Sequence, residues 1–180
     1  KENLVGGLNK GWSVAKRLLQ FERNMIAGMG FGSAASGSSK KSDAKPTSGL
    51  ATMAKRYVGE KEDKLNDSGL RNKIIDHDMN SQAFALTLRR AAEESKKSNQ
   101  GPSAASSIFK YYGTEHNKLR YEIMLEAMGT NALGWDGAEF GPEELAITRE
   151  WLRTKANSIE GGTSEVQLNV ISKRVLELPQ

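Results

Sequence analysis

A pair of glycines followed by hydroxyl and acidic side chains occupies Glu160–Glu165, near the end of the chain. Glycines permit a tight turn that a ligand can approach closely. Thr163 or Ser164 is a typical helix N-cap, Ser164 and Gln167 fit a capping box, and apolar residues at helical spacing follow. The free N–H groups of such a helix start suit an anion or an electron-rich ring edge, whereas an ordinary helix start after a loop is the commoner alternative.

Glu22 is a second candidate for chemistry, because a helical projection places it inside an apolar arc. The helix is expected over residues 12–27, with an apolar face made of Val14, Ala15, Leu18, Leu19, Phe21, Met25 and Ile26. A carboxylate held among apolar side chains has a raised pKa and is a stronger base once ionised. Glu22 is therefore a candidate general base, and the alternative is a boundary glutamate that reaches water or pairs with an arginine.

The composition restricts the class of protein. The 180 residues suffice for one domain with a core, and they include no cysteine, which excludes disulfides, thiolate metal sites and cysteine nucleophiles. The net charge of +4 comes from scattered basic residues without interleaved aromatics, so we expect no nucleic-acid partner. There is no run of about 18 apolar residues and no signal-peptide pattern, so we expect a cytoplasmic protein without a membrane span.

His77 stands between Asp76 and Asp78, a set of residue types compatible with a metal ion. A histidine that is exposed, or that is satisfied by its neighbours, is far commoner than a metal ligand. We therefore expect no metal site.

The periodicity of the chain predicts an all-α fold, an antiparallel helical bundle of four main helices with short ones in addition. Helices are expected over residues 12–27, 50–58, 69–97, 102–128 and from 142 to the glycine turn, followed by one that starts at 163 or 164. The Gly-, Ser-, Ala- and Lys-rich residues 28–48 predict a flexible loop, residues 59–68 a charged connector and residues 129–140 a glycine-bearing turn.

The long helix expected over residues 69–97 needs a cap and an inner face. Asp67 or Ser68 is suited to cap its start. Its spacing favours an inner line made of Leu70, Ile74, Met79 or His77, Ala83, Leu86 and Arg90. Pro142, followed by two glutamates, is a strong start for a later helix, because acids are favourable at the positive end of the helix dipole.

Three longer stretches carry a family resemblance. They are NLVGGLNKGWSVAKRLLQFER at residues 3–23, EFGPEELAITREWLRTKANS at residues 139–158 and IEGGTSEVQLNVISKRVLELP at residues 159–179. Together they resemble acyl-CoA dehydrogenases, the flavoproteins that desaturate acyl-CoA thioesters. The resemblance implies that residues 1–180 form one C-terminal helical bundle domain, which also builds the dimer core. It further implies that an N-terminal helical domain and a central β-domain precede this piece.

The resemblance also implies where the catalytic base stands. Most members carry a catalytic glutamate immediately before the Gly-Thr of the C-terminal motif, and here that position is Gly161, which cannot take a proton. A subset carries the base on the first helix of this domain, directly before an arginine, where this chain has Glu22 and Arg23. Glu22 is therefore the implied base, with Glu160, one residue from the usual site, as the alternative.

FAD is the implied cofactor and an acyl-CoA the implied substrate, with electrons passed to an electron-transfer flavoprotein. The residues implied to line the flavin are Gly162, Thr163, Ser164 and Glu165, and Arg71 is implied to contact a cofactor phosphate in a neighbouring subunit. The residues implied to border the thioester are Phe21, Arg23 and Gly161, whose N–H would bind the thioester carbonyl. The family also implies a homodimer or homotetramer, or a heteromer, in a bacterial cytoplasm.

The turn at residues 129–140 differs from the family pattern. In the family this turn lies against the flavin across the subunit interface and carries a glutamine and paired glycines. Here Leu133–Gly137 reads LGWDG, so those contacts are not expected in the usual form. A large ring packed at the end of the bundle is the alternative for Trp135.

A non-catalytic helical association subunit is the alternative function. Some family members pair an active subunit with one that lacks the base, and Gly161 lacks it here. An isolated helical domain also lacks much of the flavin pocket. We therefore expect residues 1–180 alone neither to hold FAD tightly nor to turn over.

Overall fold

The computed structural model describes residues 4–19, 21, 49–98 and 105–179. It confirms the all-α fold, with residues 11–19 helical at the N-terminal end. The labelled elements are α2 (Gly49–Val58), β1 (Glu60–Lys61), β2 (Lys64–Leu65), α3 (Ser68–Ser98), α4 (Ala105–Met128), the 3₁₀ helix η1 (Gly129–Leu133), α5 (Pro142–Asn157) and α6 (Ser164–Arg174). The expected flexible loop at 28–48 lies outside the described residues.

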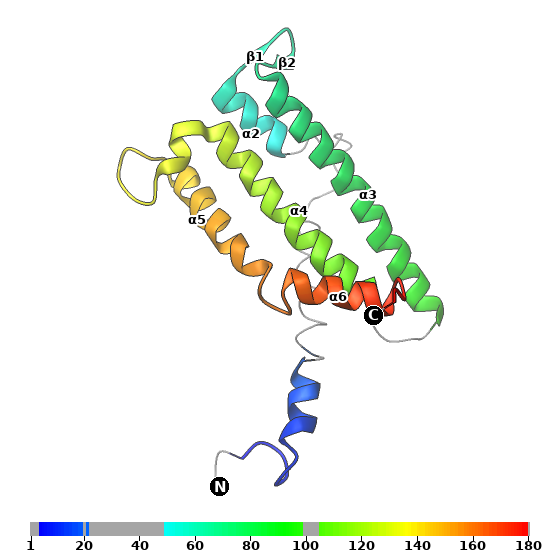
Figure 1. Ribbon diagram of the computed structural model, residues 1–180. Helices are drawn as coiled ribbons and strands as arrows, with labels where there is room; N and C mark the ends of the chain where they lie inside the picture. The colour runs from blue at the N-terminus through cyan, green and yellow to red at the C-terminus, as the bar shows by residue number, and fades with distance from the viewer. Residues whose placement is uncertain (1–3, 20, 22–48, 99–104, 180) are drawn as a thin grey trace.

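Helix α4 is the centre of the bundle (Figure 1). It packs against α2, α3, α5 and α6. The long helices α3 and α4 run antiparallel, α5 lies along the other side of α4, and α6 crosses the end at which α4 begins. The long neighbouring helices therefore run antiparallel, as expected for a helical bundle. Within the described residues, no helix has the length and apolar character needed to span a membrane.

The tightly packed core lies at the α2 end of the bundle. Its buried residues are Leu50, Ala54, Leu65, Leu70, Ile74, Ile123, Met124 and Ala127. They come from α2, the first turns of α3 and the last turns of α4, with Leu65 added by a short hairpin. This core fixes how α3 and α4 meet, because apolar side chains removed from water supply most of the stabilisation in a bundle of this kind.

Helix starts follow the residues that predicted them. The Asp67 carboxylate accepts the N–H of Leu70 at 2.9 Å, so Asp67 caps α3. The Glu144 carboxylate accepts the N–H of Gly141 at 2.7 Å, which caps α5 behind Pro142. The charged connector forms an antiparallel hairpin whose two strands have two residues each. The sequence did not predict this hairpin, because strands this short show no alternating pattern.

The second half of α3 faces the bundle differently from the expected line. Leu70, Ile74 and His77 are buried as expected, whereas Met79 is 65% exposed and Leu86 is 67% exposed. Ala83 and Arg90 are also exposed. The residues that turn inward instead are Ser81, Phe84 and Leu88, which continue the three-and-four spacing from His77. A serine is accepted on this inner line because it has a half-buried hydrogen-bonding partner on α4.

Two stacked histidines supply that partner. The rings of His77 and His116 lie 4.0 Å apart at an interplanar angle of 5°, and the Tyr112 ring also stacks with His116, at 5.7 Å. The Ser81 hydroxyl lies 2.7 Å from Nε2 of His116, and Nε2 of His77 lies 3.4 Å from the His116 carbonyl. The structure thus shows His77 satisfied by neighbours on both helices.

Burial of the pair favours neutral imidazole. Desolvation, with a further contribution from His77, lowers the pKa of His116 to about 4. The pKa of His77 is lowered as well, first by burial, and the backbone of His116 and the Asp78 carboxylate oppose that effect. Both rings are therefore uncharged at neutral pH, which lets them stack between α3 and α4.

Lowering the pH from 7.5 to 5 is expected to reduce the free energy of unfolding by about 1–2 kcal/mol through His116. The ordinary pKa of histidine is 6.5 and that of folded His116 is about 4, so the unfolded chain takes up the proton first. Stability is full above pH 6.5 and falls as the pH drops towards 4. Urea unfolding at both pH values measures the effect in the wild type and in His116→Phe, which keeps an aromatic ring but cannot titrate. An equal loss in the two proteins would refute the assignment to His116, since carboxylates titrate in both.

Candidate functional site

The turn between α5 and α6 holds most of the expected site residues. The hydroxyl of Thr163 accepts the N–H of Val166 at 3.3 Å, so Thr163 is the N-cap of α6. Gly161 and Gly162 have positive φ angles of 65° and 96°. The positive φ of Gly162 favours glycine, and a Cβ there would lie 2.7 Å from Nε2 of Gln167, whose flexible side chain would have to move.

The predicted capping box between Ser164 and Gln167 is wrong. Thr163 takes the cap position, so Ser164 is the first residue of the helix. Its hydroxyl donates instead to Oε1 of Glu115 on α4, at 2.9 Å. The Gln167 amide donates back to the carbonyl of Gly161 at 3.0 Å. Both side chains therefore brace the glycine turn and do not cap α6.

Two side chains of α4 reach the turn, and the sequence did not single out either of them. The Lys110 ammonium is 7% exposed and donates to the carbonyl of Gly162 at 2.7 Å. Burial favours the neutral form of Glu115, but hydrogen bonds from Lys118, Ser164 and Ser158 outweigh it and lower the pKa of Glu115. Glu115 is therefore ionised at neutral pH. A basic and an acidic group of one helix thus hold the same turn.

A pocket of about 430 Å³ opens between α4 and this turn. Its walls are formed by Tyr111, Glu115, Lys118, Ser158, Ile159, Thr163, Ser164, Glu165 and Leu168. Three of the four residues expected to line a flavin are among them. The Glu165 carboxylate accepts hydrogen bonds from its own N–H and from the Thr163 hydroxyl, which lower its pKa. The helix start is thereby partly occupied by a side chain of the protein itself.

The backbone of the turn still offers hydrogen-bond donors. Within the described part of the chain, no group accepts a hydrogen bond from the N–H of Gly161, Gly162 or Thr163. The next N–H, of Ser164, is taken by the carbonyl of Ser158 at 3.0 Å. Consecutive unpaired N–H groups at a glycine turn suit a carbonyl oxygen or another electron-rich acceptor. These donors, on a turn whose positive φ angles favour glycine, fit the polar edge of a flavin and a thioester carbonyl.

Glu160, the alternative base, is turned towards α5. Its Oε2 lies 3.3 Å from the Arg153 guanidinium, and its Oε1 accepts a hydrogen bond from the Asn157 amide. The residue is exposed, and both carboxylate oxygens are engaged at the end of α5. In this arrangement Glu160 serves an ion pair and an amide contact beside the turn.

The first helix is described only in part. Glu22 and Arg23 lie outside the described residues, so their placement against the turn stays a prediction. Phe21 is described and is 60% exposed. In the described part of this helix, Leu18 and Leu19 are exposed as well.

Arg71 and the glycine turn lie at opposite ends of α4. Two residues after Arg71, the Lys73 ammonium pairs with Glu126 at 2.7 Å, near the end of α4. Lys110, which contacts the turn, lies near the start of the same helix. A rise of 1.5 Å per residue separates positions 110 and 126 by about 24 Å along the axis. The structure therefore does not bring Arg71 to the turn of its own chain.

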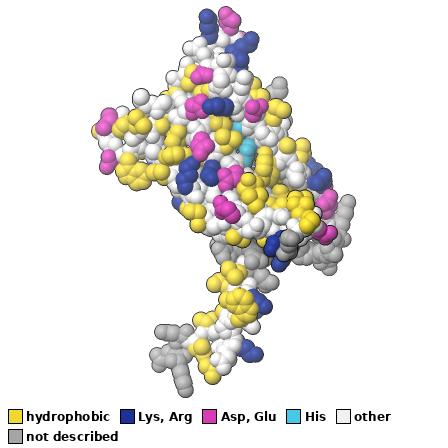
Figure 2. Space-filling view, viewed as in Figure 1, with side chains coloured by type: hydrophobic (Ala, Val, Ile, Leu, Met, Phe, Trp, Pro, Cys, Tyr) yellow, Lys and Arg dark blue, Asp and Glu magenta, His cyan; other side chains and the backbone are white. Residues whose placement is uncertain are grey.

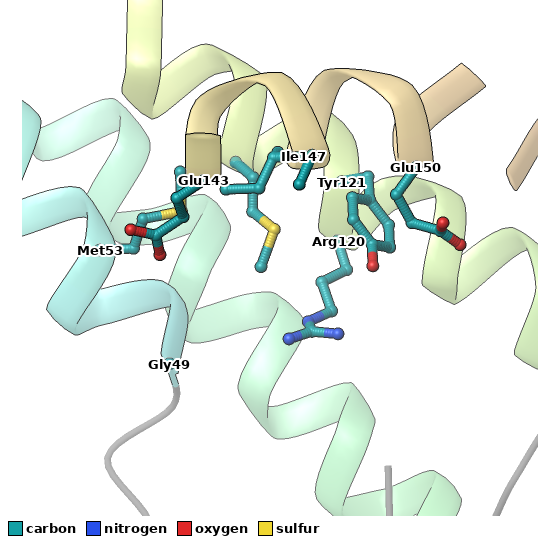
Figure 3. A pocket seen from close by; sticks show the side chains of 9 residues that line it. Gly49, Met53, Arg120, Tyr121, Glu143, Ile147 and Glu150 are labelled. Carbon is teal, nitrogen blue, oxygen red and sulfur yellow. The ribbon is translucent and has the colours of Figure 1, made fainter. Parts of the chain in front are cut away.

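A second pocket, of about 550 Å³, opens between α2, α4 and α5 (Figure 3). Met53, Met124 and Ile147 contribute apolar surface, and the Arg120 side chain extends into the open space. The other lining residues are Gly49, Tyr121, Glu143, Ala146 and Glu150. Among the predicted site residues that the structure describes, none lines this pocket.

The turn after α4 is exposed at its tip. Trp135 is 55% exposed and Leu133 is 80% exposed, so the alternative of a ring packed into the bundle end is wrong for this chain. The Arg149 guanidinium lies 5.3 Å from the centre of the Trp135 ring. It also donates a hydrogen bond to the backbone carbonyl of Trp135 at 2.7 Å. An apolar loop tip is thus held in a fixed position on the surface.

Comparison with known proteins agrees with the resemblance seen in the sequence. A chain segment of residues 9–176 matches the family described as acyl-CoA dehydrogenase, C-terminal domain. The acyl-CoA dehydrogenase FadE34 of Mycobacterium tuberculosis is 28% identical over 99% of this chain and 21% of its own length. Two acyl-CoA dehydrogenases named IpdE1 are also similar. The protein of Mycobacterium tuberculosis is 25% identical over 98% of this chain and 40% of its own length. The protein of Mycolicibacterium smegmatis is 29% identical over 98% of this chain and 39% of its own length.

The chain spans between about a fifth and two fifths of the length of these relatives. The family match, in contrast, covers nearly all of the chain and includes both the described part of the first helix and the glycine turn. The helical bundle is the architecture that this match implies, and the structure has it. The chain belongs to the acyl-CoA dehydrogenase C-terminal domain family.

Proposed function

We propose that this chain is the C-terminal domain of a flavin-dependent acyl-CoA dehydrogenase that introduces an α,β double bond into an acyl-CoA thioester. The observation that carries the proposal is the glycine turn, in which unpaired N–H groups follow one another at positive φ angles. Such a turn lets an acceptor approach the backbone closely. Membership of the family supports an acyl-CoA as the substrate and FAD as the cofactor.

The reaction needs a base at the α carbon and hydrogen bonds at the thioester carbonyl. In the proposal, the Glu22 carboxylate accepts the α proton, and the N–H of Gly161 donates to the carbonyl oxygen and so acidifies the α carbon. Phe21 and Arg23 border the thioester. General-base catalysis of this kind contributes about 10²–10⁴-fold to a rate.

FAD, when bound, supplies the acceptor for the hydride that leaves the β carbon. The chain's own part is to hold the cofactor through Gly162, Thr163, Ser164 and Glu165. Arg71 would serve the cofactor of a neighbouring subunit, and its position at the far end of α4 from the turn supports that division. The reduced flavin would be reoxidised by an electron-transfer flavoprotein.

Exposed apolar side chains support assembly with a second copy or a related chain. Met79 and Leu86 form an outward stripe on α3, and Val166 and Leu168 are half exposed on α6. Hydrophobic side chains gather near α6 on one face of the molecule (Figure 2). Apolar surface of this kind marks an interaction site when it is contiguous. A homodimer or homotetramer would cover it.

The function is tested with the full-length protein and a panel of acyl-CoA thioesters. We expect the purified protein to absorb at flavin wavelengths and to reduce an artificial electron acceptor with at least one thioester. Residues 1–180 alone are expected neither to retain FAD tightly nor to turn over, because the bundle supplies only one wall of the flavin site. A full-length protein that binds no added FAD would refute the proposal.

The second candidate is a non-catalytic association subunit, favoured by Gly161 at the usual position of the base. It predicts that the full-length protein is inactive alone and that a partner chain carrying the base restores dehydrogenation. Assays of the separate and mixed chains distinguish the two candidates.

A further inference from the structure

Helix α4 carries a buried cation that points at the glycine turn. Lys110 is 7% exposed, and its ammonium group donates to the carbonyl of Gly162 at 2.7 Å. A lysine is seldom buried without a partner that offsets its desolvation. Burial lowers the pKa of Lys110, while the carboxylates of Glu115, Glu160 and Glu165 oppose that effect. Three acidic side chains thus help to keep the cation at this place.

The ends of the turn are fixed on one carboxylate of the same helix. Oε1 of Glu115 accepts the hydroxyls of Ser158 and Ser164, each at 2.9 Å, and Oε2 accepts the Lys118 ammonium at 2.8 Å. Ser158 follows the end of α5, and Ser164 opens α6. The turn is therefore held at both ends by Glu115 and in the middle by Lys110.

The contact of Lys110 affects a neighbouring donor. The carbonyl of Gly162 and the N–H of Thr163 belong to one planar peptide unit. A cation at the oxygen polarises that unit, and hydrogen bonds in series strengthen one another in a site of low dielectric. Thr163 lines the pocket of about 430 Å³, and its N–H has no acceptor among the described residues.

We propose that Lys110 is a positioning residue that fixes and polarises the Gly162–Thr163 peptide, so that the Thr163 N–H binds the polar edge of the flavin. Glu115 keeps both ends of the turn in register for that contact. The inference rests on the proposed function, because it needs a flavin at the turn. It adds a charged group, away from the ligand, that controls the strength of a backbone donor.

The test compares Lys110 variants in the full-length protein with FAD. Lys110→Met removes the charge at similar length, Lys110→Gln keeps a neutral donor, and Lys110→Arg keeps the charge. Lys73→Met is the matched control, since it removes an ammonium from an exposed ion pair at the other end of the bundle. The measurements are the dissociation constant for FAD, the flavin reduction potential and the melting temperature.

We expect Lys110→Met and Lys110→Gln to weaken FAD binding about tenfold, which corresponds to about 1.4 kcal/mol, and to make the reduction potential more negative. A weakened donor stabilises the electron-rich reduced flavin less, whereas a purely structural role would leave the potential of the bound flavin unchanged. Lys110→Arg is expected to recover most of the affinity, and Lys73→Met to match the wild type.

Two failures are distinguishable. A wild-type protein that binds no FAD refutes the proposed function and the inference with it. A wild-type protein that binds FAD, with Lys110→Gln equal to Lys73→Met in affinity and potential, overturns the role of Lys110 alone. If Lys110→Met does not fold, Lys110→Gln and Lys110→Arg decide the question by the same two quantities.

Discussion

Replacing Glu22 by glutamine in the full-length protein is expected to lower kcat for acyl-CoA dehydrogenation about 10²–10⁴-fold. Glutamine keeps the size and polarity of the side chain but cannot accept the α proton. FAD binding and the affinity for the thioester are expected to change little, because the substitution removes one proton acceptor and leaves the turn intact. Steady-state kinetics with an artificial electron acceptor measure the effect.

Glu160→Gln is the matched control for this substitution. Glu160 contacts Arg153 and Asn157 at the end of α5, so its replacement is expected to weaken a surface ion pair and to leave kcat within about threefold of the wild type. The reverse pattern, with Glu160→Gln inactive and Glu22→Gln active, would assign the base to Glu160. If kcat is unimpaired in both variants, neither Glu22 nor Glu160 is the base.

Replacing Leu70 by alanine is expected to lower the free energy of unfolding by about 2–5 kcal/mol. Leu70 is 2% exposed and belongs to the core that joins α2, α3 and α4. Its loss removes buried apolar area and leaves a cavity that rigid helices close only in part. Urea denaturation gives the change, and the glycine turn at the other end of α4 should keep its contacts.

Leu119→Ala makes the same chemical change at an exposed place on α4. Leu119 is 44% exposed, so its replacement is expected to cost less than about 1 kcal/mol. Equal losses in the two variants would mean that Leu70 is not a core residue in the folded protein in solution. A loss confined to Leu70→Ala would confirm where the core lies.

Local chemistry made the helix boundaries predictable. Asp67 caps α3, Pro142 opens α5, and Thr163 was one of the two residues expected to cap α6. Each of these signals acts within about one helical turn, so the sequence alone contains it. The glycine turn was predictable for the same reason, because positive φ angles select glycine.

Contacts between distant residues were not predictable. Lys110 and Glu115 look like ordinary surface charges, and their partners Gly162, Ser158 and Ser164 lie 43 to 52 residues away along the chain. The predicted inner line of α3 was partly wrong for a related reason. Ser81 faces inward because it contacts His116, which lies 35 residues later in the chain. Hydrophobic spacing alone therefore predicted an inner line through Met79 and Leu86, which are exposed.

The central place of α4 has a consequence for synthesis. Every other labelled α-helix of the described bundle, α2, α3, α5 and α6, packs against it, yet α2 and α3 precede it in the chain. On the ribosome their apolar faces therefore stay uncovered until Met128, the last residue of α4, has emerged. At about 5–20 residues per second, the delay from the end of α3 is a few seconds, during which the nascent chain is a natural client for chaperones.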